Sequence, residues 1–283
     1  MRPSTSTVAR CCPDAVPIIS SRSNARVKAI RALREKRERD VNGTFFAEGR
    51  RLLQAALQTG AVIEECVLAP DRIDDAEAHL VEQLDELGVP MLEVTPELFD
   101  LMAFREEAQS IGAVVRQRWE TLSSVIDSRR CWLALHDIQH PGNLGTLIRT
   151  CDAAGGDGVI ISGRSTDPYH PMAVRGTLGA LFSQRIVRAT EADFARWLPH
   201  SGCLVIGTSP DGDADYRELD YVSKPVVIIG GNERVGVSKE QIALCDRLVR
   251  IPMAGYVESL NLGIATALVL YEVLRQHEAL ESK

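Results

Sequence analysis

The sequence predicts an α/β protein in two parts, with a mainly parallel sheet in the larger C-terminal part. In that part, short β-branched apolar runs alternate with helical stretches, at residues 132–135, 158–161, 184–187, 204–206, 226–229 and 248–251. Runs that are apolar throughout are typical of strands buried on both faces, as in parallel sheets covered by helices. The same alternation occurs once earlier, over residues 44–116, and the polar segment 120–130 separates the two. These observations predict two α/β units joined by a linker at residues 120–130.

Composition sets the broad class of the protein. With 283 residues, 45% of them hydrophobic and 25% charged, the chain is long enough for two folded cores. No apolar run can span a membrane and the N-terminus lacks a signal-peptide core, so we expect a cytoplasmic protein without membrane contact. The seven cysteines form no CxxC and no Cys/His ligand spacing, which predicts reduced thiols and no metal site. The net charge of −7 argues against indiscriminate nucleic-acid binding but is compatible with a local basic surface.

The chain begins with a segment that lacks periodicity, residues 1–21, which we expect to be a loose tail. Residues 22–39 then carry eight Lys or Arg and only two acids, and on a helix this run gives a basic face. Such a face has two interpretations, a solvated helix surface or a surface that contacts RNA phosphates. If RNA is the partner, the expected contacts are Arg22, Arg26, Lys28, Arg31, Arg34 and Arg37.

The smaller unit, residues 22–119, continues with alternating elements. Strands are expected at residues 44–49, 63–68, 91–94 and 111–116. Helices are expected at residues 50–59, 75–87 and 96–102, the last with Pro96 in its first turn, where the missing N–H has no partner to lose. No set of residues in this unit resembles a catalytic site. The chemistry is therefore expected in the second unit, residues 131–283.

Polar loops follow three predicted strands of the larger unit, at the edge where parallel sheets bind ligands. The first, residues 136–145, leads into a helix with Asn143 at or near its N-cap and Arg149 one and a half turns later. Its plain interpretation is a cap with an exposed arginine. The third, residues 251–261, precedes an apolar helix at residues 262–271 that Ser259 or Asn261 can cap. The plain interpretation there is a capped core helix.

The second loop, GGNERVG at residues 230–236, invites comparison with phosphate-binding loops. Gly231 and Gly236 have the P-loop spacing, but Val237 occupies the position of the required lysine, and no GxGxxG is present. A nucleoside triphosphate or a dinucleotide is therefore not expected as the ligand.

Taken together, the three loops resemble the three ordered motifs of the SpoU (TrmH) family of RNA ribose 2'-O-methyltransferases. The resemblance rests on Asn143 with Arg149, on GNExxG at residues 231–236, and on IPM at residues 251–253 followed by SLN at residues 259–261. AEGR at residues 47–50 and TPEL at residues 95–98 resemble the L30e-like substrate-binding domain that many members carry in front. The resemblance covers nearly the whole chain after Ser21.

The resemblance implies a SPOUT fold, in which the C-terminal segment forms a deep trefoil knot, and a homodimer with its site near the subunit interface. Family members bind S-adenosylmethionine inside the knot; carried over, its contacts here are Thr208, Gly231, Ile251 and Leu260. The family's arginine is proposed to help deprotonate the ribose hydroxyl, but an arginine is almost always protonated. We therefore expect Arg149 to clamp a phosphate and orient the hydroxyl, with Asn143, Ser259 and Asn261 positioning the ribose and Glu233 bracing the loops.

The expected reaction is methyl transfer from S-adenosylmethionine to a ribose 2'-hydroxyl of structured RNA, with 23S-type ribosomal RNA favoured because the front domain resembles a ribosomal-protein fold. The alternatives are a tRNA 2'-O-methyltransferase and a non-catalytic RNA-binding or assembly factor with the same fold. His140 stands where the family often has aspartate, and Gly263 where it often has a small hydroxyl residue. These departures leave the target nucleotide open.

Overall fold

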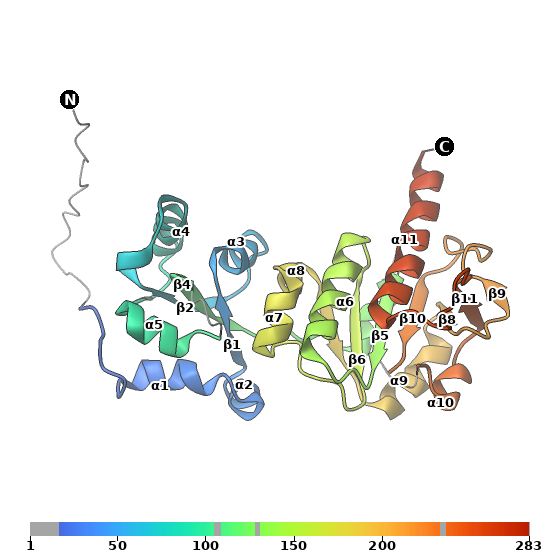
Figure 1. The fold of residues 1–283 in the computed structure, drawn as a ribbon, viewed down its shortest axis with the longest axis horizontal. Coiled ribbons are helices and arrows are strands. Elements are labelled where there is room, and N and C mark those ends of the chain that lie inside the picture. The colour runs from blue at the N-terminus through green and yellow to red at the C-terminus, as the bar shows by residue number, and fades with distance from the viewer. Residues whose placement is uncertain (1–16, 105–108, 128–130, 233–235, 283) are drawn as a thin grey trace.

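The computed structural model describes residues 17–104, 109–127, 131–232 and 236–282, and it consists of two α/β parts arranged along the long axis of the molecule (Figure 1). The N-terminal part contains a four-stranded sheet and the C-terminal part a seven-stranded sheet. The predicted α/β class is confirmed.

The N-terminal sheet has β4 at its centre, antiparallel to β1 and β2, while β3 pairs with β2 in parallel. A capping box of Asp74 and Glu77 begins α4, and Pro96 lies in the first turn of α5, as the sequence predicted. The elements are α1 (Ala25–Ala32), α2 (Lys36–Asn42), β1 (Thr44–Glu48), α3 (Arg50–Gln58), β2 (Ile63–Leu68), α4 (Asp75–Glu86), β3 (Met91–Glu93), α5 (Pro96–Met102) and β4 (Ile111–Arg116).

The C-terminal sheet is parallel in every described pairing, with the order β7-β6-β5-β10-β8-β11-β9. Each of the six predicted runs overlaps a strand, and the central strands are buried along almost their whole length, as expected for a sheet covered on both faces. Among the strands of this sheet that the structure describes, the two-residue β9, too short to show periodicity, is the one that was not predicted. The strands are β5 (Cys131–His136), β6 (Gly158–Ser162), β7 (Arg185–Arg188), β8 (Leu204–Thr208), β9 (Ala214–Asp215), β10 (Val226–Gly230) and β11 (Arg247–Arg250).

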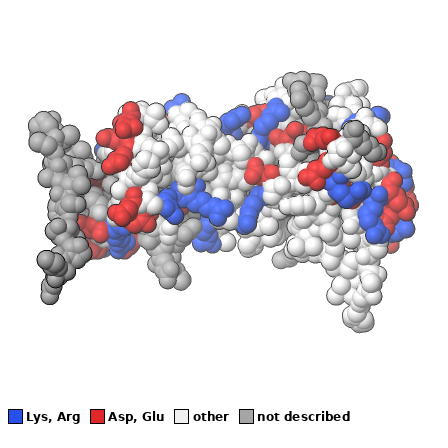
Figure 2. Space-filling model, turned by 90° about the horizontal axis from the view of Figure 1, so that it is seen from above, with Lys and Arg blue, Asp and Glu red and all other residues white. Residues whose placement is uncertain are grey.

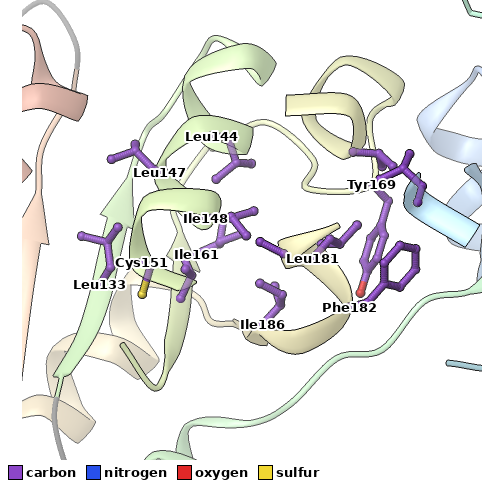
Figure 3. Close-up of a cluster of buried hydrophobic side chains, with 14 of the residues drawn as sticks. Leu133, Leu144, Leu147, Ile148, Cys151, Ile161, Tyr169, Leu181, Phe182 and Ile186 are labelled. Atoms are coloured by element: carbon purple, nitrogen blue, oxygen red, sulfur yellow. The ribbon is translucent and has the colours of Figure 1, made fainter. Parts of the chain in front are cut away.

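Helices cover this sheet, and the main hydrophobic core lies beneath one of them. Leu144, Leu147 and Ile148 of α6 lie over Leu133 of β5 and Ile161 of β6 (Figure 3). Packing of α6 on α7 is tight, because a Cβ at position 145 would lie 2.4 Å from the carbonyl oxygen of Ala173, and only glycine fits there. The helices are α6 (Pro141–Ala153), α7 (Pro171–Thr177), α8 (Ala180–Ser183), α9 (Glu191–Trp197), α10 (Lys239–Ile242) and α11 (Leu262–Glu281).

A continuous core joins the two parts of the molecule. The ring of Phe45 on β1 lies 4.8 Å from that of Tyr169 and 6.1 Å from that of Phe182, measured between centroids. The Tyr169 hydroxyl donates to the carbonyl oxygen of Arg118 at 2.6 Å. These contacts bury apolar surface from both sheets in one cluster, so the parts are packed against each other as well as connected.

The segment predicted as a linker follows the edge strand β7 over its described residues, 120–127. The amide of Glu120 donates to the carbonyl oxygen of Ile186 at 2.8 Å, and its carboxylate accepts from Arg185 Nε at 2.8 Å and from Ser124 Oγ at 2.9 Å. The segment is therefore held to the C-terminal sheet by hydrogen bonds.

Three expectations need correction. The single basic helix at residues 22–39 is wrong: α1 and α2 are separate, because Glu35 has an extended backbone and starts α2. The helix expected at residues 262–271 continues to Glu281, ten residues beyond its apolar stretch. Ile19, within the expected tail, pairs with Val94, so ordered structure begins before residue 22; the rest of that tail lies mostly outside the described residues.

Candidate active site

A cavity of about 270 Å³ opens at the carboxyl ends of β8, β10 and β11. This is the edge of the sheet at which the sequence placed the ligand site. Four of the predicted residues line it: Thr208, Ile251, Ser259 and Leu260. The other lining residues come from the same segments of the chain and are Ser209, Pro210, Asn232, Gly236, Val249, Met253, Glu258, Leu262 and Ala265.

Strand ends and one helix start position the predicted residues. Thr208 is the last residue of β8, paired with Val249, and Ile251 directly follows β11. The loop then reaches Asn261, whose side chain accepts from the amide of Gly263 at 2.9 Å and caps α11. One of the two caps predicted for this helix is thereby confirmed, and the cap fixes where the loop meets the helix beside the cavity.

Gly231 does not line the cavity but shapes the loop above β10. A Cβ at this position would lie 2.1 Å from the carbonyl oxygen of Gly236, so a side chain does not fit. Asn232 and Gly236 exchange two backbone hydrogen bonds of 2.9 Å, which close the loop on itself. Glu233, predicted to brace this loop, lies outside the described residues.

The side chain of Asn232 connects two of the predicted loops. Its Nδ2 donates to the carbonyl oxygen of Asp137 at 3.0 Å, joining the loop after β10 to the loop after β5. Asp137 has a left-handed backbone with φ of 54°, which is uncommon for a residue other than glycine. The first and second polar loops are therefore in direct contact.

Helix α6 carries the two predicted catalytic residues of the first motif. Its N-cap is His140, whose Nδ1 accepts from the amide of Gly142 at 3.2 Å. Asn143, expected at or near the cap, is instead half-buried in the first turn, and Arg149 is exposed farther along the helix. Asn143, Arg149 and Asn261 are not among the residues that line the cavity.

The lining of the cavity fits S-adenosylmethionine in its chemistry. Ile251, Leu260 and Leu262 offer apolar surface to an aromatic ring system, and Thr208 and Ser259 offer hydroxyl groups to polar atoms. Glu258 supplies a carboxylate, which suits a ligand that carries a positive charge. The cofactor predicted from the sequence thus has a cavity with suitable groups at the predicted position.

Sequence reasoning missed several lining residues, of which Asn232, Met253 and Glu258 are examples. All three lie within the loops that had been singled out. Their positions within those loops were the available signal, but the direction in which each side chain points depends on the folded loop.

Outside the cavity, His136, Asp137 and Glu191 form a small titratable cluster. His136 Nε2 lies 3.5 Å from a carboxylate oxygen of each acid. This is the group among the described residues whose ligand atoms are close enough together to hold a metal ion. The same distances are also expected for a histidine that interacts with two carboxylates and no metal. The predicted absence of a metal therefore stays a prediction.

The six candidate RNA contacts are all exposed, but two of them are engaged within the protein. Arg26 pairs with Glu65. Arg34 donates to the carbonyl oxygens of Leu101 and Ala103, at 3.1 and 2.6 Å. In the described part of the chain no ion pair involves the other four, Arg22, Lys28, Arg31 and Arg37.

No helix among the described residues is long and apolar enough to cross a membrane.

Comparisons with known proteins match both parts of the chain. Residues 130–271 match the SpoU rRNA Methylase family, and residues 24–113 match the MRM3-like substrate binding domain. The 23S rRNA (guanosine(2553)-2'-O)-methyltransferase RlmP of Bacillus subtilis is 31% identical over 90% of this chain and 98% of its own length. The 23S rRNA (uridine(2479)-2'-O)-methyltransferase of Streptomyces viridochromogenes is 32% identical over 91% of this chain and 92% of its own.

Solved structures that superpose on this chain are also methyltransferases. An rRNA methyltransferase from Sinorhizobium meliloti, crystallised with S-adenosylmethionine bound, superposes with a TM-score of 0.83 at 38% identity, covering 92% of this chain and 97% of that one. The SpoU methyltransferase AviRb from Streptomyces viridochromogenes in complex with the same cofactor gives a TM-score of 0.81 at 29% identity, covering 90% and 99%.

Proposed function

The chain belongs to the SpoU rRNA methylase family, and from this premise we propose that it transfers a methyl group from S-adenosylmethionine to a ribose 2'-hydroxyl of 23S-type ribosomal RNA. The observation that carries the proposal is the cavity built from the second and third motifs at the carboxyl ends of β8, β10 and β11. Relatives named for this reaction match the chain over nearly their whole length, front domain included. Ribosomal RNA as substrate supports a cytoplasmic location.

The bound cofactor supplies a methyl group that its sulfonium already activates, so the residues of this chain have to align the ribose and assist loss of the hydroxyl proton. Ile251 and Leu260 hold the cofactor, with Thr208 beside them, and Gly231 allows the loop after β10 to close tightly next to the cavity. Arg149 is exposed, as a group that meets the RNA must be, and a guanidinium that stays charged suits a phosphate clamp better than a base. Asn143, Ser259 and Asn261 position the ribose, and Glu233 braces the loop.

The RNA lies along the edge of the molecule that carries both the basic helices and the site. In Figure 1, α1 and α2 lie on the same side as α9 and α10, the helices that follow the carboxyl ends of β7 and β10. Exposed Lys28, Arg31 and Arg37 give that edge positive charge. On the opposite side, seen in Figure 2, acidic and basic side chains are interspersed. A strand of RNA held on α1 and α2 can therefore extend to the cavity.

The active form is a homodimer. Apolar side chains are exposed on α11 and on the loop that lines the cavity, among them Tyr256, Val257, Ile264 and Tyr271. Tyr256 has no cover from its own chain, being fully exposed. Exposed apolar side chains on the helix and loop that border a ligand cavity fit an interface with a second copy of the chain.

The C-terminal segment forms the knot expected of the fold. Strand β8 lies between β10 and β11, so the chain crosses β8 after leaving β10. It then returns through the loop 251–261 to α11, which packs on α6 and β10. This outward crossing and return is the path that a knotted C-terminus requires.

The test is methyl transfer itself. Purified protein, labelled S-adenosylmethionine and 23S rRNA from cells that lack the gene should give one new 2'-O-methylated nucleotide, located by mass mapping. Transfer RNA from the same cells serves as the competing substrate. Transfer to tRNA alone would favour the tRNA alternative. Absence of S-adenosylmethionine binding by calorimetry, together with retained RNA binding, would favour a non-catalytic assembly factor.

A further inference from the structure

Arg39 is the one member of the basic run at residues 22–39 that is buried, and its partner belongs to the other part of the molecule. Nε and Nη2 of Arg39 lie 2.9 and 2.8 Å from Oδ2 of Asp167, and the two side chains are 1% and 3% exposed. Nη1 donates to the carbonyl oxygens of Leu33 and Arg34, at 2.8 and 2.7 Å. The guanidinium thus ties the turn between α1 and α2 to the C-terminal part.

Asp167 lies in the loop between β6 and α7, which is bonded in turn to the loop of the first motif. The amide of Thr166 donates to the carbonyl oxygen of Ile138 at 2.7 Å, and Ser165 Oγ accepts from the amide of Ile138 at 3.1 Å. The amide of Arg164 donates to Asp137 Oδ1 at 2.6 Å. These contacts hold the strand-to-helix connection that leads into α6.

The chain of contacts ends at the cofactor cavity. Asp137 accepts from the side chain of Asn232, which lines that cavity. Hydrogen bonds and a short stretch of backbone, residues 164–167, therefore connect the turn between the two basic helices, through Arg39 and Asp167, to the loop after β5 and the loop after β10.

Stability alone is a poor reason for burying this pair. Taking two charges out of water is costly, and replacing a buried ion pair by apolar residues of similar volume is often neutral or stabilising. The seam between the parts already has an apolar contact, between Phe45 and Tyr169. An ion pair adds what an apolar contact lacks, a fixed direction: guanidinium and carboxylate bond in defined geometry.

We propose that Arg39 and Asp167 are positioning residues, which fix the RNA-holding helices α1 and α2 relative to the first motif so that the target ribose meets the methyl group. The inference rests on the proposed function, because it assumes that RNA is held on α1 and α2 and modified at the cavity. It assigns no contact with RNA or cofactor to either residue; both act through the loops that they hold.

The test separates positioning from stability by comparing single and double substitutions in the full-length protein. Arg39→Met leaves Asp167 buried without its partner and should lower both the melting temperature and the single-turnover transfer rate. The double variant Arg39→Met with Asp167→Leu replaces the pair by apolar side chains and should recover the melting temperature. Its transfer rate at saturating RNA should stay at least about tenfold below the parent, since small misplacements are costly in catalysis. Its affinity for S-adenosylmethionine should be unchanged within about twofold.

Arg72→Met is the matched control, because Arg72 forms an exposed ion pair with Asp100 within the N-terminal part. It should alter neither rate nor affinity. Full recovery of the rate in the double variant would overturn the inference, since the pair would then be merely structural.

Hydrogen exchange provides a measurement that does not depend on methyl-transfer activity. In the double variant the amides of Thr166 and Ile138 should exchange faster than in the parent, whereas unchanged exchange at both would also overturn the inference. If the parent protein methylates no RNA, the proposed function fails, and this exchange arm still decides whether the pair holds the loops.

Discussion

Arg149 occupies an unusual position for the catalytic role proposed for it, since it is exposed on α6 and does not line the cavity. An exposed guanidinium is accessible to a phosphate of a bound RNA. Its separation from the cavity lining also means that cofactor binding and the arginine can be tested independently.

Arg149→Ala should leave the affinity for S-adenosylmethionine nearly unchanged and lower methyl transfer by at least about a hundredfold, the scale of one lost transition-state contact. Calorimetry gives the affinity and single-turnover assays the rate. Arg196→Ala, which removes an exposed arginine paired with Asp193 on α9, is the control. Collapse of cofactor affinity in Arg149→Ala would contradict the assignment and make the residue structural.

At the scale of residues, the sequence indicated where the site lies better than how its side chains point. Of the four cofactor contacts that the family resemblance implied, Thr208, Ile251 and Leu260 line the cavity and Gly231 does not. The cap of α6 was misplaced: His140 caps it, although Asn143 is the stronger N-cap residue type by propensity. Pro141 in the first turn starts the helix earlier than the asparagine would.

At the scale of elements, α1 and α2 differ from the single basic helix that was predicted. They leave fewer basic side chains available to contact RNA phosphates. Arg34 is held by the carbonyl oxygens of Leu101 and Ala103, and Arg39 is buried. Lys28, Arg31 and Arg37 are exposed and therefore better placed to meet RNA phosphates. Sequence alone cannot distinguish these groups, because their partners come from distant segments.

Replacing Lys28, Arg31 and Arg37 together by glutamine should weaken RNA binding and flatten its dependence on salt. Each lost phosphate contact lowers the log-log slope by roughly 0.7 to 0.9, so three should remove about two units. Binding curves at several salt concentrations measure this slope. Arg34→Gln is the comparison, expected to change stability more than the slope. Parallel lines for the triple variant and the parent would show that α1 and α2 do not contact phosphates.

The segment predicted as a linker, described over residues 120–127, offers a pH-dependent test of the hydrogen bonds that hold it to β7. Burial favours the neutral acid of Glu120, but hydrogen bonds from Ser124 and Arg185 outweigh it and lower the pKa of the carboxyl below its ordinary value. A lowered folded-state pKa stabilises the fold above the unfolded-state pKa, and the contribution disappears as pH falls through the folded-state value.

Glu120→Gln should therefore reduce the free energy of unfolding by about 1–2 kcal/mol near pH 7. The difference from the parent should shrink as pH falls below about 4.3, the ordinary pKa of a glutamate, because the carboxyl then takes up a proton first in the unfolded chain. Denaturant titrations at both pH values measure it. Glu86→Gln, at an exposed position of α4, should have little effect at either. A difference that stayed constant with pH would show that the charge of Glu120 is not what holds the segment.

Most elements were predictable because the pattern that identifies them is also what buries them. The strands of the C-terminal sheet are short apolar runs since both faces are covered, and β2, α5 and β4 match their predicted bounds. Short elements such as α8 and β9 are set by tertiary contacts and carry too few residues for a period. The order of strands in the sheet likewise depends on pairings far apart in sequence.

At the scale of the whole molecule, the exposed apolar surface of α11 gives the test of assembly. Ile264→Glu with Tyr271→Glu should weaken dimerisation at least about a hundredfold, because like charges would face each other across the interface. Light scattering at micromolar concentration should then report a monomer. Leu87→Glu, at an apolar position in the N-terminal part that is even more exposed, should leave the dimer intact. A parent protein that is already monomeric would remove the basis of this prediction.

The packing of α11 against α6 and β10 also has a consequence for biosynthesis. The N-terminal part has all its strands once residue 116 is made, and it can begin to fold while translation continues. The cofactor cavity, by contrast, needs residues 251–265. A nascent chain stalled before residue 251 can therefore have folded its basic helices while it still lacks Ile251, Ser259 and Leu260 of the cavity lining. Under the proposed function, cofactor binding is thus confined to chains translated past the last lining residue, and a partly made protein cannot modify RNA.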